Sequence, residues 1–140
     1  MKKQKKDFVD VGTALFKRHR FKDSIPYLEE ATATYSDVEF PHMLGLAHFS
    51  KKEKDHNAAI GSLFDALDKP DATIYGGIAN GVYKDLPRVL QSAGRAKEAE
   101  VSANITEILD RNPEAQINSS RLMDLQVTLT RMVFPKAQHG

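Results

Sequence analysis

The side chains that are able to do chemistry in this chain are first of all its five histidines, and their spacing does not predict a metal site. His42 and His48 are six residues apart on one expected helix, whereas ligands on a helix must be four apart to share a face. His19 and His56 lie at expected turns, and His139 is in the tail. Cysteine is absent, which excludes thiolate ligands, a cysteine nucleophile and disulfides.

A glycine-rich stretch, YGGIANG at residues 75–81, invites comparison with a phosphate-binding loop. It lacks the Gly-Lys-Ser/Thr ending of such a loop, and no strand is expected before it, so a helix kink or close helix packing is favoured. The serines have no histidine at a recognisable spacing, and the carboxylates are scattered over helix faces. We therefore expect a non-enzyme without a cofactor; a catalytic alternative would need a polar pocket assembled only in space.

The charge balance argues against a nucleic-acid partner. Twenty basic and 19 acidic residues leave a net charge of +1. The basic segment 1–6 is expected to be a solvated tail rather than a binding arm, and the acidic residues just after it do not fit a signal peptide. No apolar run approaches the length of a membrane span, so we expect a soluble, cytoplasmic protein.

Two stretches of helical periodicity, 7–18 and 22–35, predict a first pair of helices. The apolar positions of the first are Phe8, Val11, Leu15 and Phe16. Those of the second are Ile25, Leu28, Ala31 and Tyr35. Asp7 is expected to cap the first helix, and Pro26 lies in or just after the first turn of the second, where its missing N–H costs least.

Small residues fall where two antiparallel helices would cross. Gly12 and Ala31 provide the missing bulk, and large neighbours fill the space beside them. The first helix reads Phe8-x-x-Val11-Gly12-x-x-Leu15, and the second reads Ser24-x-x-x-Leu28-x-x-Ala31. This pattern resembles the tetratricopeptide repeat, with its W-x-x-L-G-x-x-Y and A-x-x-x-F-x-x-A motifs.

A second copy of the pattern occupies residues 39–69. Its helices are expected at about 39–51 and 56–68, with Leu44-Gly45 in the first and Ala59-x-x-x-Leu63-x-x-Ala66 in the second. His48 takes the place of the packing aromatic of the repeat, which favours a core role for it. The Lys-rich turn between the helices is expected to be exposed.

A third copy, at about 71–111, departs from the pattern. Its second helix is expected at 96–111 after a turn at Gly94. Its first is longer by about six residues and contains glycines and Pro87, so we expect either one helix kinked near Pro87 or two helices with a break. A last helix, at about 115–133, is expected to cap the stack.

The sequence thus predicts a single all-α domain over 1–140, a right-handed stack of about three antiparallel hairpins with a C-terminal capping helix. The resemblance implies a concave groove lined by the first helices of the repeats. Its inward positions would be Val9, Thr13, Phe16 and Lys17, then His42, Leu46, Phe49 and Ser50, then Lys84, Arg88 and Gln91.

The predicted function is a non-catalytic interaction module, an adaptor or scaffold, that binds a peptide or partner helix in this groove. Val9 and Thr13 do not match the residues with which the family's chaperone-binding members hold a terminal carboxylate. We expect instead an apolar patch that includes Phe16 and Phe49, bordered by Lys84 and Arg88. Three alternatives remain. The two phenylalanines pack against neighbouring repeats or the last helix, or the last helix folds back and fills the groove. Otherwise the groove receives the equivalent helix of another copy, so that the protein is a structural one that associates with itself.

Overall fold

The computed structural model describes residues 5–70, 72, 76–111 and 120–135 of the 140-residue chain. These residues form seven α-helices and contain no strand, which confirms the all-α class. The chain divides into two compact units, Met1–Lys69 and Pro70–Gly140. Each unit is described by itself.

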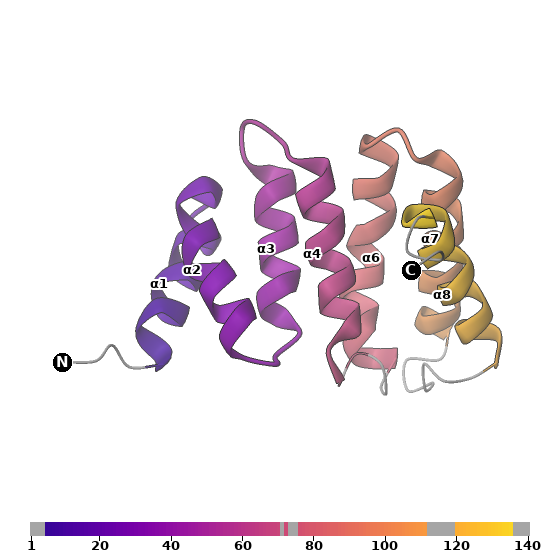
Figure 1. Cartoon of the computed structure of the whole chain (residues 1–140), viewed down its shortest axis with the longest axis horizontal. Coiled ribbons are helices and arrows are strands. Elements are labelled where there is room, and N and C mark those ends of the chain that lie inside the picture. Colours follow the sequence, from indigo (N-terminus) through magenta and orange to yellow (C-terminus); the bar gives the residue numbers. More distant parts are fainter. Residues whose placement is uncertain (1–4, 71, 73–75, 112–119, 136–140) are drawn as a thin grey trace. The chain divides into compact units, whose positions relative to one another are not determined.

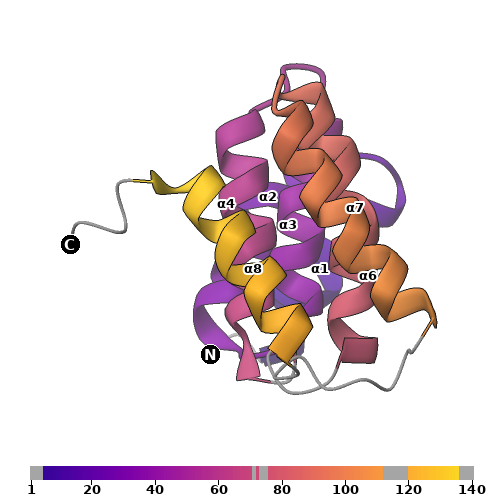
Figure 2. The ribbon, with the colours of Figure 1, turned by 90° about the vertical axis from the view of Figure 1, so that its right-hand side faces the viewer.

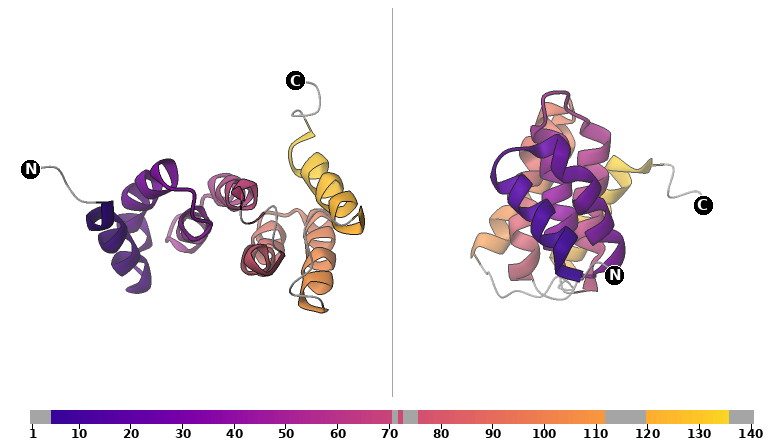
Figure 3. Two further views of the ribbon diagram at one scale, coloured as in Figure 1. Left: turned by 90° about the horizontal axis from the view of Figure 1, so that it is seen from below. Right: turned by 90° about the vertical axis from the view of Figure 1, so that its left-hand side faces the viewer.

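The N-terminal unit consists of four helices: α1 (Lys5–Lys17), α2 (Phe21–Thr34), α3 (Glu39–Ser50) and α4 (His56–Asp68). Helix α1 packs on α2, α2 on α3, and α3 on α4. Figure 1 shows these helices running alternately up and down, and the left view of Figure 3 looks nearly along α3 and α4, which lie side by side. The α1–α2 turn and the α3–α4 turn therefore lie at the same end of the unit (Figure 1).

The predicted N-cap of the first helix is wrong. Helix α1 already begins at Lys5, so Asp7 lies inside its first turn, where a carboxylate still interacts favourably with the helix dipole. A side-chain cap does occur at α4, where Asp55 Oδ1 accepts a hydrogen bond of 3.0 Å from the N–H of Ala58.

The core of the N-terminal unit is built where the helices approach most closely. Buried side chains from α1, α2 and α3 form two adjoining clusters: Phe8, Ala31 and Phe40, and Leu28, Leu44 and Ala47. Gly12 and Gly45 are buried at the crossings, as their positions in the sequence predict. A Cβ added at Gly12 would lie 2.8 Å from Tyr27 Cβ, and one at Gly45 would lie 2.9 Å from Leu63 Cγ.

The C-terminal unit contains α6 (Gly76–Ser92), α7 (Ala96–Arg111) and α8 (Ser120–Val133), with α7 packed on both α6 and α8 (Figure 2). Tyr83 joins all three: its carbonyl accepts from Thr106 Oγ1 at 2.6 Å, and its hydroxyl accepts from Gln126 Nε2 at 2.8 Å. Just before α7, Arg95 Nη1 donates a hydrogen bond of 3.1 Å to the carbonyl of Val133, the last residue of α8. Helix α8 is thus fixed to its own unit.

Residues 76–92 form one helix that runs through Pro87. A break within this range, one of the two expected courses, is therefore not found. The expected helix start at Asp71 and the expected first residues of the capping helix, 115–119, lie outside the described residues.

Alanine substitution tests the close crossings. Gly12→Ala and Gly45→Ala should each lower the free energy of unfolding by about 1–2 kcal/mol, because the cost of overpacking exceeds the gain of about 1 kcal/mol in helix propensity. Gly61 lies inside α4 with nothing within 4 Å of an added Cβ, so Gly61→Ala should instead raise stability by up to about 1 kcal/mol. Urea unfolding followed by circular dichroism measures all three. Equal effects at Gly45 and Gly61 would contradict the proposed crossing.

Candidate functional site

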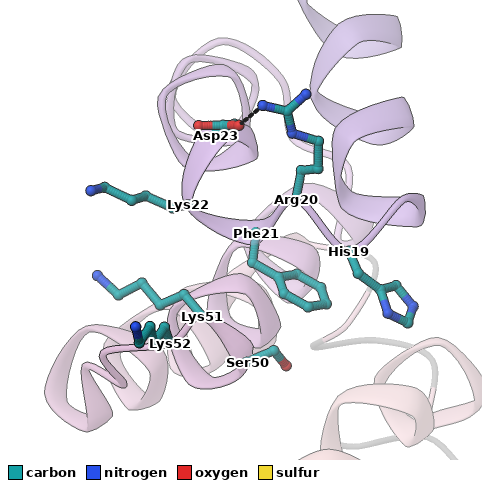
Figure 4. Close-up of a pocket in the computed structure, with 8 residues that line it drawn as sticks. All are labelled: His19, Arg20, Phe21, Lys22, Asp23, Ser50, Lys51 and Lys52. Carbon is teal, nitrogen blue, oxygen red and sulfur yellow. Dashed lines mark ion pairs between the residues drawn. The ribbon is translucent and has the colours of Figure 1, made fainter.

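A pocket of about 430 Å³ opens where the two hairpin turns of the N-terminal unit meet (Figure 4). One wall comes from the α1–α2 turn and the start of α2, and the other from the end of α3 and the turn after it. Its lining residues are His19, Arg20, Phe21, Lys22, Asp23, Ser50, Lys51 and Lys52.

The pocket carries positive charge that is only partly neutralised. Arg20 Nη2 is paired with Asp23 Oδ2 at 2.6 Å. Within the described residues, no carboxylate lies at ion-pair distance from the ammonium groups of the other cations of the pocket, Lys22, Lys51 and Lys52. Figure 4 shows these three lysine side chains extending to the same side.

The charge gathers here because both hairpin turns are basic. Residues 17–23 and 50–55 together hold seven Lys or Arg and three Asp or Glu, although the whole chain has a net charge of only +1. Antiparallel hairpins that pack in sequence place their turns at one end, and this end thereby collects both basic runs. The basic residues of the two turns are visible in the sequence as HR at 19–20 and KK at 51–52. They indicate a basic site only when the two turns are considered together.

The aromatic side of the pocket is formed by Phe21, which is half-buried. Its ring meets that of Phe16 edge-on, with centroids 5.5 Å apart, and stacks with the ring of His19 at 5.3 Å. Phe16 in turn packs against the cluster around Leu28. The lining of the pocket therefore includes an aromatic ring supported by the core as well as cationic side chains, and Figure 4 shows the Phe21 ring and the lysine side chains extending in opposite directions.

The backbone of the α1–α2 turn holds this arrangement. His19 has φ 61°, in the left-handed region, and the N–H of Arg20 donates to the carbonyl of Leu15 at 2.9 Å to close the end of α1. A residue other than glycine costs about 1–2 kcal/mol there. Gly94 takes the same place in the α6–α7 turn, with φ 80°. At the start of α2, Arg20 makes no capping hydrogen bond with its side chain, so the positive end of that helix dipole adds to the field of the pocket.

The site residues predicted on α1 and α3 are mostly half-buried. Those half-buried are Val9, Thr13, Phe16, His42 and Leu46, whereas Lys17 and Ser50 are exposed. Val9 contacts the cluster of Phe8, Ala31 and Phe40. Of all these residues, Ser50 lines the pocket directly and Phe16 supports it through Phe21.

The expectation that Phe49 belongs to an exposed patch is wrong. Its side chain is only 8% exposed, because the turn after α3 folds back over it. Lys54 Nζ lies 4.6 Å from the centre of the Phe49 ring and donates to the Phe49 carbonyl at 2.8 Å, and the ring of His56 lies 6.1 Å away. These contacts of Phe49 lie within its own hairpin.

The remaining predicted residues, Lys84, Arg88 and Gln91, are exposed on α6 of the C-terminal unit. Lys84 Nζ lies 3.7 Å from Asp110 Oδ1, and Arg88 Nη2 lies 3.2 Å from Asp85 Oδ1. Their charges are thus partly balanced within their own unit. That they border the residues of α1 and α3 stays a prediction.

His48, predicted to have a core role, is half-buried on α3, and its Nδ1 is buried without a hydrogen-bond partner in the described structure. Burial lowers the pKa of His48 below its usual 6.5, and the nearby Lys51 lowers it further, against smaller opposing effects of Asp55 and Glu29. The folded state therefore favours the neutral ring.

This environment makes stability depend on pH. Near pH 6.5 and just below it, the unfolded chain binds more protons at His48 than the folded one, so stability is full above pH 6.5 and falls on acidification. The loss of thermal stability between pH 7.5 and about pH 5 should be smaller in His48→Gln than in the parent chain. Calorimetry at matched ionic strength measures the difference, and identical slopes would contradict a depressed pKa.

In the described part of the chain, no three His, Asp or Glu side chains are grouped in a way that would hold a metal ion. Nor does any described helix combine the length and the apolar character needed to cross a bilayer.

Comparison with protein-family models, with curated proteins and with solved structures finds no match. The likeness to tetratricopeptide repeats therefore rests on the motifs alone.

Proposed function

We propose that this protein is a non-catalytic interaction module that binds an acidic peptide segment of a partner protein in the basic pocket of the N-terminal unit. The observation that carries this proposal is that three lysines without carboxylate partners, among the described residues, line one pocket together with Phe21. Acidic side chains of the peptide would face Lys22, Lys51 and Lys52, and an apolar side chain next to them would contact Phe21.

A peptide suits this pocket better than a nucleic acid does. Protein–DNA complexes commonly neutralise roughly six to ten phosphates, whereas this pocket offers three lysines, and Asp23 already engages Arg20. Phe21 is half-buried with Phe16 and His19 against its ring, which leaves little aromatic face for a base to stack on. An acidic peptide needs only a few cations and a small apolar contact.

The pocket also agrees in part with the groove implied by the repeat resemblance. Ser50 and Phe16, both inward positions of that comparison, line the pocket or support it. A peptide seated on Phe21 would continue along the half-buried face of α1 that includes Val9 and Thr13. We propose this direction for the bound peptide, and with it the adaptor role.

Binding at such a site should be modest and salt-dependent. Exposed charges act mainly by steering association, and each lysine at the rim contributes on the order of 1 kcal/mol. The apolar contact with Phe21 adds the part of the affinity that salt does not screen.

Charge reversal tests the proposal. A fluorescein-labelled peptide of six glutamates followed by leucine serves as the probe in anisotropy titrations at low salt. Lys22→Glu, Lys51→Glu and Lys52→Glu should each weaken binding by about fivefold to tenfold, because each replaces an attraction with a repulsion. Lys97→Glu, an exposed lysine of α7 with the same charge change, should leave binding within about twofold of the parent.

Two outcomes would overturn the proposal. One is an equal loss of affinity in Lys97→Glu, which would mean that only net charge matters. The other is tighter binding of a single-stranded RNA of equal charge, which would make nucleic acid the ligand. Circular dichroism of each variant checks that the helices are intact.

A further inference from the structure

Helix α8 exposes a stripe of large apolar side chains. Met123 is 47% exposed, Val127 is 44% exposed, and Phe134, directly after the helix, is 37% exposed. The N–H of Phe134 donates to the carbonyl of Thr130 at 2.8 Å, which continues the helical hydrogen bonding to this residue. At about 3.6 residues per turn, positions 123, 127 and 134 therefore lie on one face.

This stripe is separate from the side of α8 that packs in the unit. Leu122, Leu129 and Val133 are buried, and they lie on the face turned toward α7. Asp124 and Arg131 are exposed and follow the outer edge of the stripe, one near each end. The outer face of α8 is thus apolar along its middle and carries both signs of charge along one edge.

We infer that this face of α8 binds the same face of a second copy of the chain, with the two helices antiparallel. The charges argue for this occupant. A two-fold axis between positions 127 and 128 places Asp124 of each copy level with Arg131 of the other, so that two equivalent ion pairs flank the stripe. The same axis places Met123 of each copy about 3 Å along the helix from the level of Phe134 of the other, within the range of a contact between sulfur and an aromatic ring.

The charges also select the orientation. In an antiparallel pair related by a two-fold axis, the charged edge of one helix faces the charged edge of the other. In a parallel pair, the charged edge of one helix would instead face the uncharged edge of the other, which holds Gln126 and the buried Val133. Only the antiparallel pair matches acid with base.

A contact between two single helices is small, so the dimer should be weak. Its area falls at or below the roughly 1,200 Å² typical of transient complexes, for which dissociation constants in the micromolar range or above are ordinary. The stripe and the basic pocket belong to different units, so the inference does not rest on the proposed function.

Sedimentation equilibrium of the full chain from micromolar to millimolar concentration measures the association. Val127→Asp places a charge in the middle of the stripe and should abolish the dimer. Thr128→Asp, exposed on α8 but about a third of a turn away from the stripe, should retain it. Circular dichroism confirms that both variants keep their helices.

Exchange of the charges gives a second test. Asp124→Arg and Arg131→Asp should each raise the dissociation constant about tenfold, because each places like charges opposite one another twice. The chain that carries both substitutions should recover the parent value. Absence of this recovery would overturn the assigned pairing.

Single cysteines test the orientation in a chain that has none of its own. Under mild oxidation Val127→Cys should form a disulfide-linked dimer, since the two copies of position 127 lie nearest the axis. Met123→Cys should not, because its two copies would lie about 13 Å apart along the helices, beyond the reach of a disulfide. Cross-linking at position 123, or a parent chain that stays monomeric at millimolar concentration, would overturn the inference.

Discussion

Two antiparallel helices can approach closely only where one or both lack bulk at the crossing, and in the N-terminal unit Gly12 and Gly45 meet this constraint. The close crossings join α1 to α2 and α3 to α4. Both turns lie at one end of the unit, and the basic pocket is formed between them. The candidate site therefore lies at an end of hairpins whose close packing depends on Gly12 and Gly45.

Helical periodicity was sufficient to locate the helices, because each buries one continuous face. Helix α4 lies at His56–Asp68 and α7 at Ala96–Arg111, as their patterns predict. Helix ends were less predictable: Asp7 has the right side chain for a cap, but α1 begins at Lys5. The burial of Phe49 depends on Lys54 folding back from a turn, and no spacing rule contains that contact. The pocket, too, joins residues about 30 positions apart, which periodicity within one helix does not detect.

The pairing of charges differs between the pocket and helix α6. On α6, both cations have a carboxylate close by, Lys84 with Asp110 and Arg88 with Asp85, and on α7 Arg111 is paired with Glu107. Such exposed pairs contribute little to stability, but they reduce the field that a passing anion meets. The lysines of the two hairpin turns lack these partners in the described structure, so a chain of nearly zero net charge still presents a locally attractive end.

Each helix of the N-terminal unit packs chiefly on the helix that precedes or follows it. Contacts of this kind join residues that are near in sequence, so little chain entropy is lost before they form, and folding of the unit should be fast. On the ribosome, the segment Met1–Lys69 would hold all four of its helices before synthesis of the remaining chain is complete. The basic pocket would then be present on the nascent chain, and a partner would be able to bind during translation.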